Sequence, residues 1–334
     1  MVTAAAMQTR PAGIVTLTLN PALDLATTTA QVAPTHKLRC GPVQRFPGGG
    51  GINVARVLHR LGAGVQAWTL AGGAAGAQMG ALLAAEGVAT RLHPIAGDTR
   101  ENLSVVETST GREFRFVLPG PDVTPDEWQA LLTDLTALMP EPGAERAAPP
   151  ATRWWVASGS LPPGLPDTIY ADLAHAARRQ GVRLALDTSG PALAAALQAG
   201  VALVKPSLRE LRELLQQPLE GPADWHRAAM SLVQQGQAEV VALSLGEQGA
   251  LLATPGGTWQ APALPTVAQH GTTGAGDCFL AALVWALDRG DAPPEALRWG
   301  IAAGAAALQS PGTSLAATAD VQRLVAQVPA PTAL

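Results

Sequence analysis

Residues 271–287, GTTGAGDCFLAALVWAL, join a glycine-broken turn to an apolar run without a helix breaker before Asp288. The pattern predicts a loop that leads into the N-terminus of a buried helix. Such a terminus carries unpaired backbone N–H groups and a partial positive charge, so it favours an anion. Gly274 and Gly276 would let the backbone approach a phosphate group without a Cβ in the way. We therefore expect an anion site here.

Asp277 directly follows these glycines, although a carboxylate repels a phosphate group. One role that explains its presence is that of a general base, which takes the proton of a hydroxyl that attacks phosphorus. The alternative is that Asp277 only caps the helix, as Asp commonly does. For an isolated glycine motif we would favour the cap, because short glycine motifs give many false positives. The remainder of the chain decides between the two.

The composition is that of an ordinary globular protein, with 334 residues, 47% hydrophobic and 14% charged. The length suits one large domain or two. A net charge of −4 gives no basic surface for nucleic acid, so we expect no such partner. Cys40 and Cys278 lie far apart in the sequence, which favours free thiols in a reducing compartment. No signal peptide or run of about 20 apolar residues is visible, so we expect a cytoplasmic protein without membrane contact.

Strand-like and helix-like segments alternate, most regularly from residue 152 onward. Residues 14–19, IVTLTL, predict a first strand that ends at Asn20 and Pro21. The alternation predicts an α/β fold with a mostly parallel sheet covered by helices on both faces. Ligands bind such sheets at the carboxyl ends of the strands. The polar residues expected at these ends are Ser158, Ser160, Asp187, Lys205 and Ser244, of which Asp187 has no visible partner and favours a structural or turn role.

A smaller sheet is predicted beside the main one. Residues 103–118 alternate between apolar and polar side chains around a turn at 109–112, which is typical of a hairpin with one apolar face. Together with residues 25–46 it would form a lid, and its apolar face favours a homodimer. The domain division that we expect is a core of 12–22, 48–94 and 121–328, a lid of 23–47 and 95–120, and flexible tails of 1–11 and 329–334.

A second glycine-rich stretch, FPGGGGINVARVLHRLG, opens a predicted helix that ends at Gly62. Four adjacent glycines suit a place where a ligand touches the backbone, and Asn53 in the first turn offers hydrogen bonds to a polyol. The stretch lacks the spacing of a dinucleotide fingerprint and the Gly-Lys-Ser/Thr of a Walker A loop. Asp24 and Arg100 are further candidates, for a ligand contact and a phosphate clamp, although a turn residue and a solvated charge are the ordinary alternatives. No Cys/His cluster has metal spacing, and the GxSxG nucleophile elbow is absent.

Taken together, these motifs resemble the PfkB (ribokinase-like) family of sugar kinases from about residue 14 to residue 325. The segments that carry the likeness are TLTLNPALD, GGGGINVARVLHRLG, TRENL, SGSLPPG, KPSLRELREL, SLGEQGA and GTTGAGDCFLAAL, in that order. Within the family, HKLRC followed by PGGGGIN is most similar to the minor 6-phosphofructokinase branch, since 1-phosphofructokinases usually carry GKGIN. Tagatose-6-phosphate kinases are also similar.

The resemblance implies a ribokinase-like core with a β-sheet lid, and ATP-dependent phosphorylation of fructose 6-phosphate at its 1-hydroxyl. It implies that Asp277 is the general base. The other roles that it implies are an anion hole at Gly274, Ala275 and Gly276; a sugar site of Asp24, Gly48, Gly49, Asn53 and Ser160; a 6-phosphate site of Arg100 and Lys37; and a site for nucleotide and Mg²⁺ at Lys205, Ser207, Glu210, Ser244, Gly246, Gly249 and Thr272, with Glu210 the metal residue.

Two departures from the family pattern weaken parts of this expectation. Ser207 stands where the Asn-x-x-Glu metal motif has Asn, which predicts weaker affinity for nucleotide or Mg²⁺. Ser310 and Ser314 replace larger polar or basic residues, which argues against a monovalent-cation site between their loop and residues 271–273. A 1-phosphofructokinase, a tagatose-6-phosphate kinase and a non-catalytic sugar-phosphate-binding regulator remain the alternatives.

Overall fold

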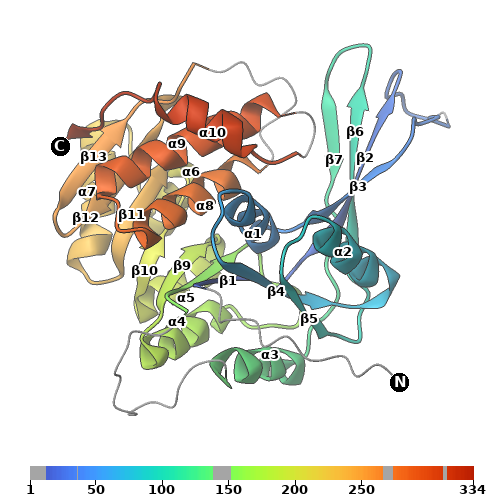
Figure 1. Ribbon diagram of the computed structural model, residues 1–334, viewed down its shortest axis with the longest axis horizontal. Helices are drawn as coiled ribbons and strands as arrows, with labels where there is room; N and C mark the ends of the chain where they lie inside the picture. Colours follow the sequence, from blue (N-terminus) through green and yellow to red (C-terminus); the bar gives the residue numbers. More distant parts are fainter. Residues whose placement is uncertain (1–12, 36, 138–151, 266–273, 311–313) are drawn as a thin grey trace.

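The computed structural model describes residues 13–35, 37–137, 152–265, 274–310 and 314–334, which form two β-sheets and their covering helices (Figure 1). Within these residues, no helix is long and apolar enough to cross a membrane. The expected tail of residues 1–11 lies outside the described residues.

The large sheet has ten strands in the order β14-β13-β12-β11-β10-β9-β8-β1-β4-β5. Neighbouring strands from β5 to β11 are parallel, and β12, β13 and β14 continue the sheet antiparallel. The α/β fold that the sequence predicts is therefore confirmed. In chain order the strands are β1 (Ile14–Thr18), β4 (Val65–Ala71), β5 (Thr90–Pro94), β8 (Trp154–Ser158), β9 (Arg183–Asp187), β10 (Val201–Val204), β11 (Ala238–Ser244), β12 (Ala250–Thr254), β13 (Gly257–Ala261) and β14 (Thr332–Ala333).

Helices cover both faces of this sheet and bury one apolar cluster on each (Figure 1). Each cluster combines one side of the strands with the apolar stripes of its helices, which removes both surfaces from water. The helices of one face are α1 (Gly50–Arg60), α2 (Gly73–Ala85), α8 (Ala275–Asp288), α9 (Pro293–Gln309) and α10 (Thr318–Val325). Those of the other are α3 (Pro125–Ala137), α4 (Ile169–Gln180), α5 (Gly190–Ala199), α6 (Leu208–Leu215) and α7 (Pro222–Gln234), while the short helix η1 (Gly246–Gln248) joins β11 to β12.

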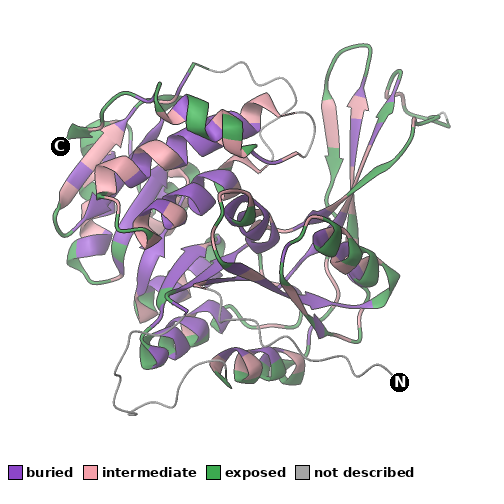
Figure 2. Ribbon diagram, in the orientation of Figure 1, coloured by how far each residue is buried: buried purple, intermediate pink, exposed green. Residues whose placement is uncertain are grey.

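The second sheet projects from the core and has the order β3-β2-β6-β7 (Figure 1). Its strands are β2 (Ala22–Thr29), β3 (Gln44–Gly48), β6 (Arg100–Glu107) and β7 (Glu113–Phe116). β6 and β7 form the predicted antiparallel hairpin, whereas β2 and β6 are parallel. Figure 2 shows the strands of the large sheet buried and those of the second sheet partly exposed. Phe116 and Leu118 are 51% and 50% exposed, so part of the apolar surface of this sheet faces water.

The prediction of a flexible tail at 329–334 is wrong. Thr332 and Ala333 form β14, which pairs with Gln260 and Trp259 of β13. Backbone hydrogen bonds carry this pairing, so the side-chain pattern of PAPTAL gives no sign of it. The strands β5 and β13 also escaped prediction, because both are short and only partly buried.

Candidate active site

Asp277 lies in the first turn of α8, whose N-cap residue Gly274 adopts the left-handed conformation with φ 78°. Its carboxylate accepts hydrogen bonds from Asn53 Nδ2 at 2.9 Å and from the Ser158 hydroxyl at 3.4 Å. Burial raises the pKa of Asp277 to about 7, and the negative charge of Asp187 adds to this effect, against the Asn53 hydrogen bond. A carboxylate with this pKa exchanges its proton near neutral pH, as a general base should.

Lys205 follows strand β10 and forms an ion pair with Asp187, with 3.1 Å between Nζ and Oδ1. Burial raises the pKa of Asp187. For Lys205, burial lowers the pKa, but the Asp187 carboxylate, followed by Asp277 and Glu210, outweighs it and keeps the pKa above its ordinary value. A Cβ on Gly276 would lie 3.5 Å from Lys205 Nζ, so the ammonium group lies against the glycine turn of α8. The partner of Asp187 that the sequence did not reveal is therefore Lys205.

Asp24 lies on β2 among the expected sugar-site residues. Its Oδ1 accepts a hydrogen bond from Asn102 Nδ2 at 2.9 Å. Gly48 on β3 is so close that a Cβ there would lie 2.1 Å from Asp24 Oδ2, which explains the need for glycine. Burial raises the pKa of Asp24, against the Asn102 hydrogen bond and then the charges of Arg115 and Arg100. The structure thus brings Asp24 and Gly48 together, with Asn102 as a partner that the sequence analysis missed.

Arg100 lies at the start of β6 and uses three of its five N–H groups on backbone carbonyls. Nη2 donates to Asn20 O at 2.9 Å, Nη1 to Leu118 O at 3.0 Å and Nε to Pro21 O at 3.4 Å. This guanidinium therefore ties the base of the second sheet to the end of β1. Its role as a phosphate clamp stays a prediction. In this conformation only the two remaining N–H groups of the guanidinium are available to bind a phosphate group.

Ser160 and Lys37 differ in how the structure places them. The Ser160 hydroxyl accepts a hydrogen bond from Asn20 Nδ2 at 3.2 Å, beside the end of β1. Lys37 is exposed on the segment between β2 and β3. The sugar and phosphate roles of both residues stay predictions.

Arg115 on β7 is a cation that the sequence analysis did not single out. It pairs with Ser104 across the hairpin, and it lines a small cavity together with Asp24 and Asn102. Strand register puts these side chains on one face of the second sheet, opposite Phe114 and Phe116. The alternation of the hairpin contained this signal, because a residue between two apolar neighbours must point to the other face.

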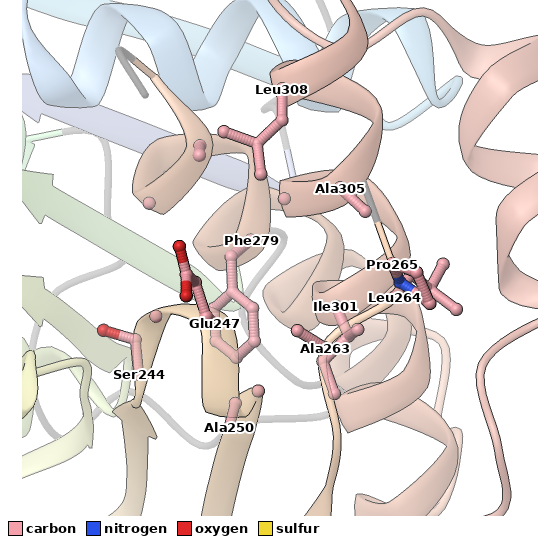
Figure 3. A pocket seen from close by; sticks show the side chains of 15 residues that line it. Ser244, Glu247, Ala250, Ala263, Leu264, Pro265, Phe279, Ile301, Ala305 and Leu308 are labelled. Atoms are coloured by element: carbon pink, nitrogen blue, oxygen red, sulfur yellow. The ribbon is translucent and has the colours of Figure 1, made fainter. Parts of the chain in front are cut away.

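A cavity of about 760 Å³ opens between η1 and the helices α8 and α9 (Figure 3). Figure 3 shows Ser244 and Glu247 on one side and the apolar side chains of Phe279 and Ile301 facing them. Apolar walls with few polar groups suit a flat aromatic ring. The lining residues are Ser244, Gly246, Glu247, Gly249, Ala250, Ala263, Leu264, Pro265, Ala275, Gly276, Phe279, Ile301, Gly304, Ala305 and Leu308. Three expected nucleotide residues and two residues of the expected anion hole therefore share one cavity.

Ser207 and Glu210 form a capping box at the start of α6. The Ser207 hydroxyl accepts from Glu210 N at 3.3 Å, and Glu210 Oε2 accepts from Ser207 N at 2.8 Å. The Ser207 hydroxyl thus has a structural role, and its nucleotide role stays a prediction. Thr272 lies outside the described residues. Among the residues that are described, no group of three or more His, Cys, Asp or Glu could hold a metal ion.

The sequence profile described as "pfkB family carbohydrate kinase" matches residues 17–320. The chain belongs to the pfkB family. This pfkB kinase is 44% identical over 319 residues to ATP-dependent 6-phosphofructokinase isozyme 2 of Mycobacterium tuberculosis, covering 96% of this chain and 91% of the relative. It is 36% identical over 277 residues to a 1-phosphofructokinase of Xanthomonas campestris, covering 82% and 83% of the two chains.

Solved structures of Escherichia coli phosphofructokinase-2 have the same fold. One is a complex with fructose-6-phosphate, with a TM-score of 0.85 and 39% identity over 95% of this pfkB kinase and 99% of that chain. Another is a complex with potassium, with a TM-score of 0.88 at the same identity and coverage. The expected membership of a sugar-kinase family is confirmed.

Proposed function

We propose that this pfkB kinase is an ATP-dependent 6-phosphofructokinase. It transfers the terminal phosphoryl group of ATP to the 1-hydroxyl of fructose 6-phosphate, which yields fructose 1,6-bisphosphate and ADP. The observation that carries the proposal is the position of Asp277: a carboxylate with a pKa near 7 that contacts Asn53 of the glycine-rich helix and begins the helix that lines the cavity. The names of its relatives support the choice of sugar.

The transfer needs one proton acceptor and a positive environment for phosphate charge. Asp277 takes the proton of the 1-hydroxyl while that oxygen forms a bond to the terminal phosphorus and the bond from phosphorus to ADP breaks. The backbone amides of Gly274, Ala275 and Gly276, which have no acceptor within helix α8, stabilise the phosphoryl oxygens. Lys205 adds a full positive charge beside this turn. Asp277 then releases its proton to solvent.

Glu210 is the residue that would hold Mg²⁺, directly or through water, together with the nucleotide phosphates. It fits this role because its charge acts on Lys205 and Asp187, while one of its oxygens is used in the capping box. Mg²⁺ commonly binds through one or two carboxylates and substrate phosphates. When bound, it neutralises charge on the transferring group.

Asp24, Gly48, Gly49, Asn53 and Ser160 hold the sugar in this proposal. Its 6-phosphate lies toward the second sheet, where Arg115 and Arg100 supply positive charge and Lys37 joins them from the second sheet of another copy. The second sheet acts as a lid, and its apolar face, with Phe116 and Leu118 half exposed, pairs two subunits. The expected division into core and lid is part of this proposal.

Fructose 1-phosphate is the second candidate substrate, since a relative of 36% identity is named 1-phosphofructokinase. Tagatose 6-phosphate is a third. The test is a coupled ADP-release assay with MgATP and each of these sugars, with the Asp277→Asn variant as control. Preference for fructose 6-phosphate supports the proposal, and preference for another sugar changes the substrate while keeping the chemistry. Failure to turn over any of the three favours a sugar-phosphate-binding regulator. Repeating the assay with and without K⁺ tests the monovalent cation.

A further inference from the structure

Helix α1 carries three polar side chains on one face, at positions 53, 56 and 60. Residues separated by three and seven positions lie on the same side of a helix. Asn53 reaches Asp277 and belongs to the site already described. Arg56 and Arg60 have no part in the mechanism above, yet both are anchored to backbone that borders the two substrate sites.

Arg56 is 3% exposed, so its charge must be fully paired. Its Nε and Nη2 donate to the two carboxylate oxygens of Glu86 at 2.9 and 2.6 Å. The remaining amino group, Nη1, donates to Pro47 O at 3.3 Å. Pro47 immediately precedes Gly48, which touches Asp24. Arg56 therefore fixes the backbone at Pro47, which leads into the glycines at 48–49 of the proposed sugar site, here called the sugar loop.

Arg60 lies one turn further along α1 and holds a different segment. Its Nη1 donates to Leu315 O at 2.9 Å and to Ala316 O at 3.3 Å. A Cβ on Gly274 would lie 2.7 Å from Leu315 Cδ2, so the held segment packs against the glycine turn of α8. Ala316 N also donates to the sulfur of Cys278, the residue after Asp277, at 3.5 Å. Arg60 thus holds the segment that packs against the proposed anion site at Gly274.

Glu86, just after α2, joins the two arginines. Besides its paired hydrogen bonds with Arg56, its Oε2 lies 3.6 Å from Arg60 Nη2. Fork-shaped guanidinium–carboxylate pairs fix orientation as well as charge. The three side chains form one cluster. At one end Arg56 contacts the sugar loop at Pro47, and at the other end Arg60 contacts residues 315–316, which pack against the glycine turn of α8.

We propose that Arg56, Arg60 and Glu86 are positioning residues for phosphoryl transfer, a proposal that rests on the proposed kinase function. Arg56 sets the sugar loop and Arg60 sets the anion turn. Glu86 keeps both in one arrangement, so that the reacting hydroxyl meets the phosphorus beside Asp277. Transfer depends on such placement, because an error of about 1 Å can reduce rate on the order of 100-fold.

The test uses the conservative variants Arg56→Lys, Arg60→Lys and Glu86→Gln, with kcat and both KM values measured. Arg56→Lys should raise KM for the sugar phosphate about tenfold and change KM for MgATP by less than about twofold. Arg60→Lys should raise KM for MgATP about tenfold or lower kcat, and it should change KM for the sugar phosphate by less than about twofold. Glu86→Gln should affect both substrates. A merely structural role would lower the melting temperature without separating the substrates in this way.

Arg298→Lys is the matched control. Arg298 pairs with Glu295 at 2.8 Å and donates to the carbonyls of Val325 and Val328, so it holds helix α10 by the same kind of bonds. Its replacement should reduce the melting temperature and leave both KM values alone. Parallel shifts of both KM values in Arg56→Lys and Arg60→Lys, or kinetics as unchanged as in Arg298→Lys, would overturn the proposal.

The assay uses whichever sugar phosphate the wild-type protein turns over fastest, so a wrong substrate assignment does not affect it. If the wild type turns over none, dissociation constants for ATP and for fructose 6-phosphate, measured by calorimetry, replace the KM values. The same split between Arg56→Lys and Arg60→Lys is then required.

Discussion

The acid limb of the pH–rate profile should report the buried environment of Asp277. Burial and the charge of Asp187 raise the pKa of Asp277 to about 7. A base with this pKa is deprotonated in about one molecule in eleven at pH 6 and in about nine of ten at pH 8. We therefore expect kcat/KM for the sugar phosphate to fall about tenfold between pH 8 and pH 6, with a midpoint near 7.

The Asp187→Asn variant supplies the decisive comparison. It removes the negative charge that raises the pKa of Asp277, and it leaves Lys205 free to stabilise the Asp277 carboxylate. The acid limb should move to lower pH, and each unit of movement corresponds to about 1.4 kcal/mol of changed interaction. The control is Asp134→Asn, whose carboxylate pairs with Arg91 at the surface.

The assay is kcat/KM by coupled ADP release from pH 5.5 to 9, in buffers of constant ionic strength. A phosphate monoester also ionises near pH 6, but that ionisation belongs to the substrate and cannot move with a substitution in the protein. A limb near pH 4 in the wild type, or a limb that Asp187→Asn leaves in place, would refute the assignment of Asp277 as base.

Three further predictions concern stability and the phosphate site. Burial raises the pKa of Asp277 only in the folded protein, so the charged carboxylate destabilises the fold increasingly as pH rises from about 4 to 7. The Asp277→Asn variant should therefore have a higher melting temperature than wild type at pH 8 and lose this advantage near pH 4. Equal melting temperatures of variant and wild type at pH 8 would contradict the prediction. Arg115→Ala should raise KM for the sugar phosphate about tenfold and spare KM for MgATP, and Arg115→Lys should retain part of the affinity; an unchanged KM removes Arg115 from the site. Ser207→Ala removes a helix cap worth about 1 kcal/mol, so it should lower the melting temperature of this 334-residue chain by roughly 1–2 °C with KM for MgATP unchanged; a raised KM without that loss would restore Ser207 as a ligand.

The sequence predicted those parts of the molecule in which local pattern and tertiary structure agree. The glycine turn before Asp277, the apolar run of α8 and the alternation after residue 152 all lead to the observed elements. The hairpin of β6 and β7 followed from its period of two. In each case the spacing of apolar residues is set by the surface that they bury.

Contacts between residues far apart in the sequence could not be predicted in the same way. Asp187 is the last residue of β9 and Lys205 follows β10, and only the parallel pairing of these two strands brings the two side chains together as an ion pair. In the sequence the Glu86 carboxylate looks like an ordinary solvated charge, and only the structure shows that the end of α2 brings it to the two arginines of α1. Ser207 was interpreted from the family pattern, while its hydroxyl serves a cap that the neighbouring Glu210 completes.

The pairing of β14 has a practical consequence for anyone who purifies this kinase. Residues 332–334 protect an edge of β13, with Leu334 N donating to Thr258 O at 2.9 Å. From β13 the chain continues into Ala263 and Leu264, which line the cavity shown in Figure 3. A purification handle fused directly after Leu334 would adjoin this short strand, and loss of the β14 pairing would uncover the edge of β13 that leads into the wall of the cavity.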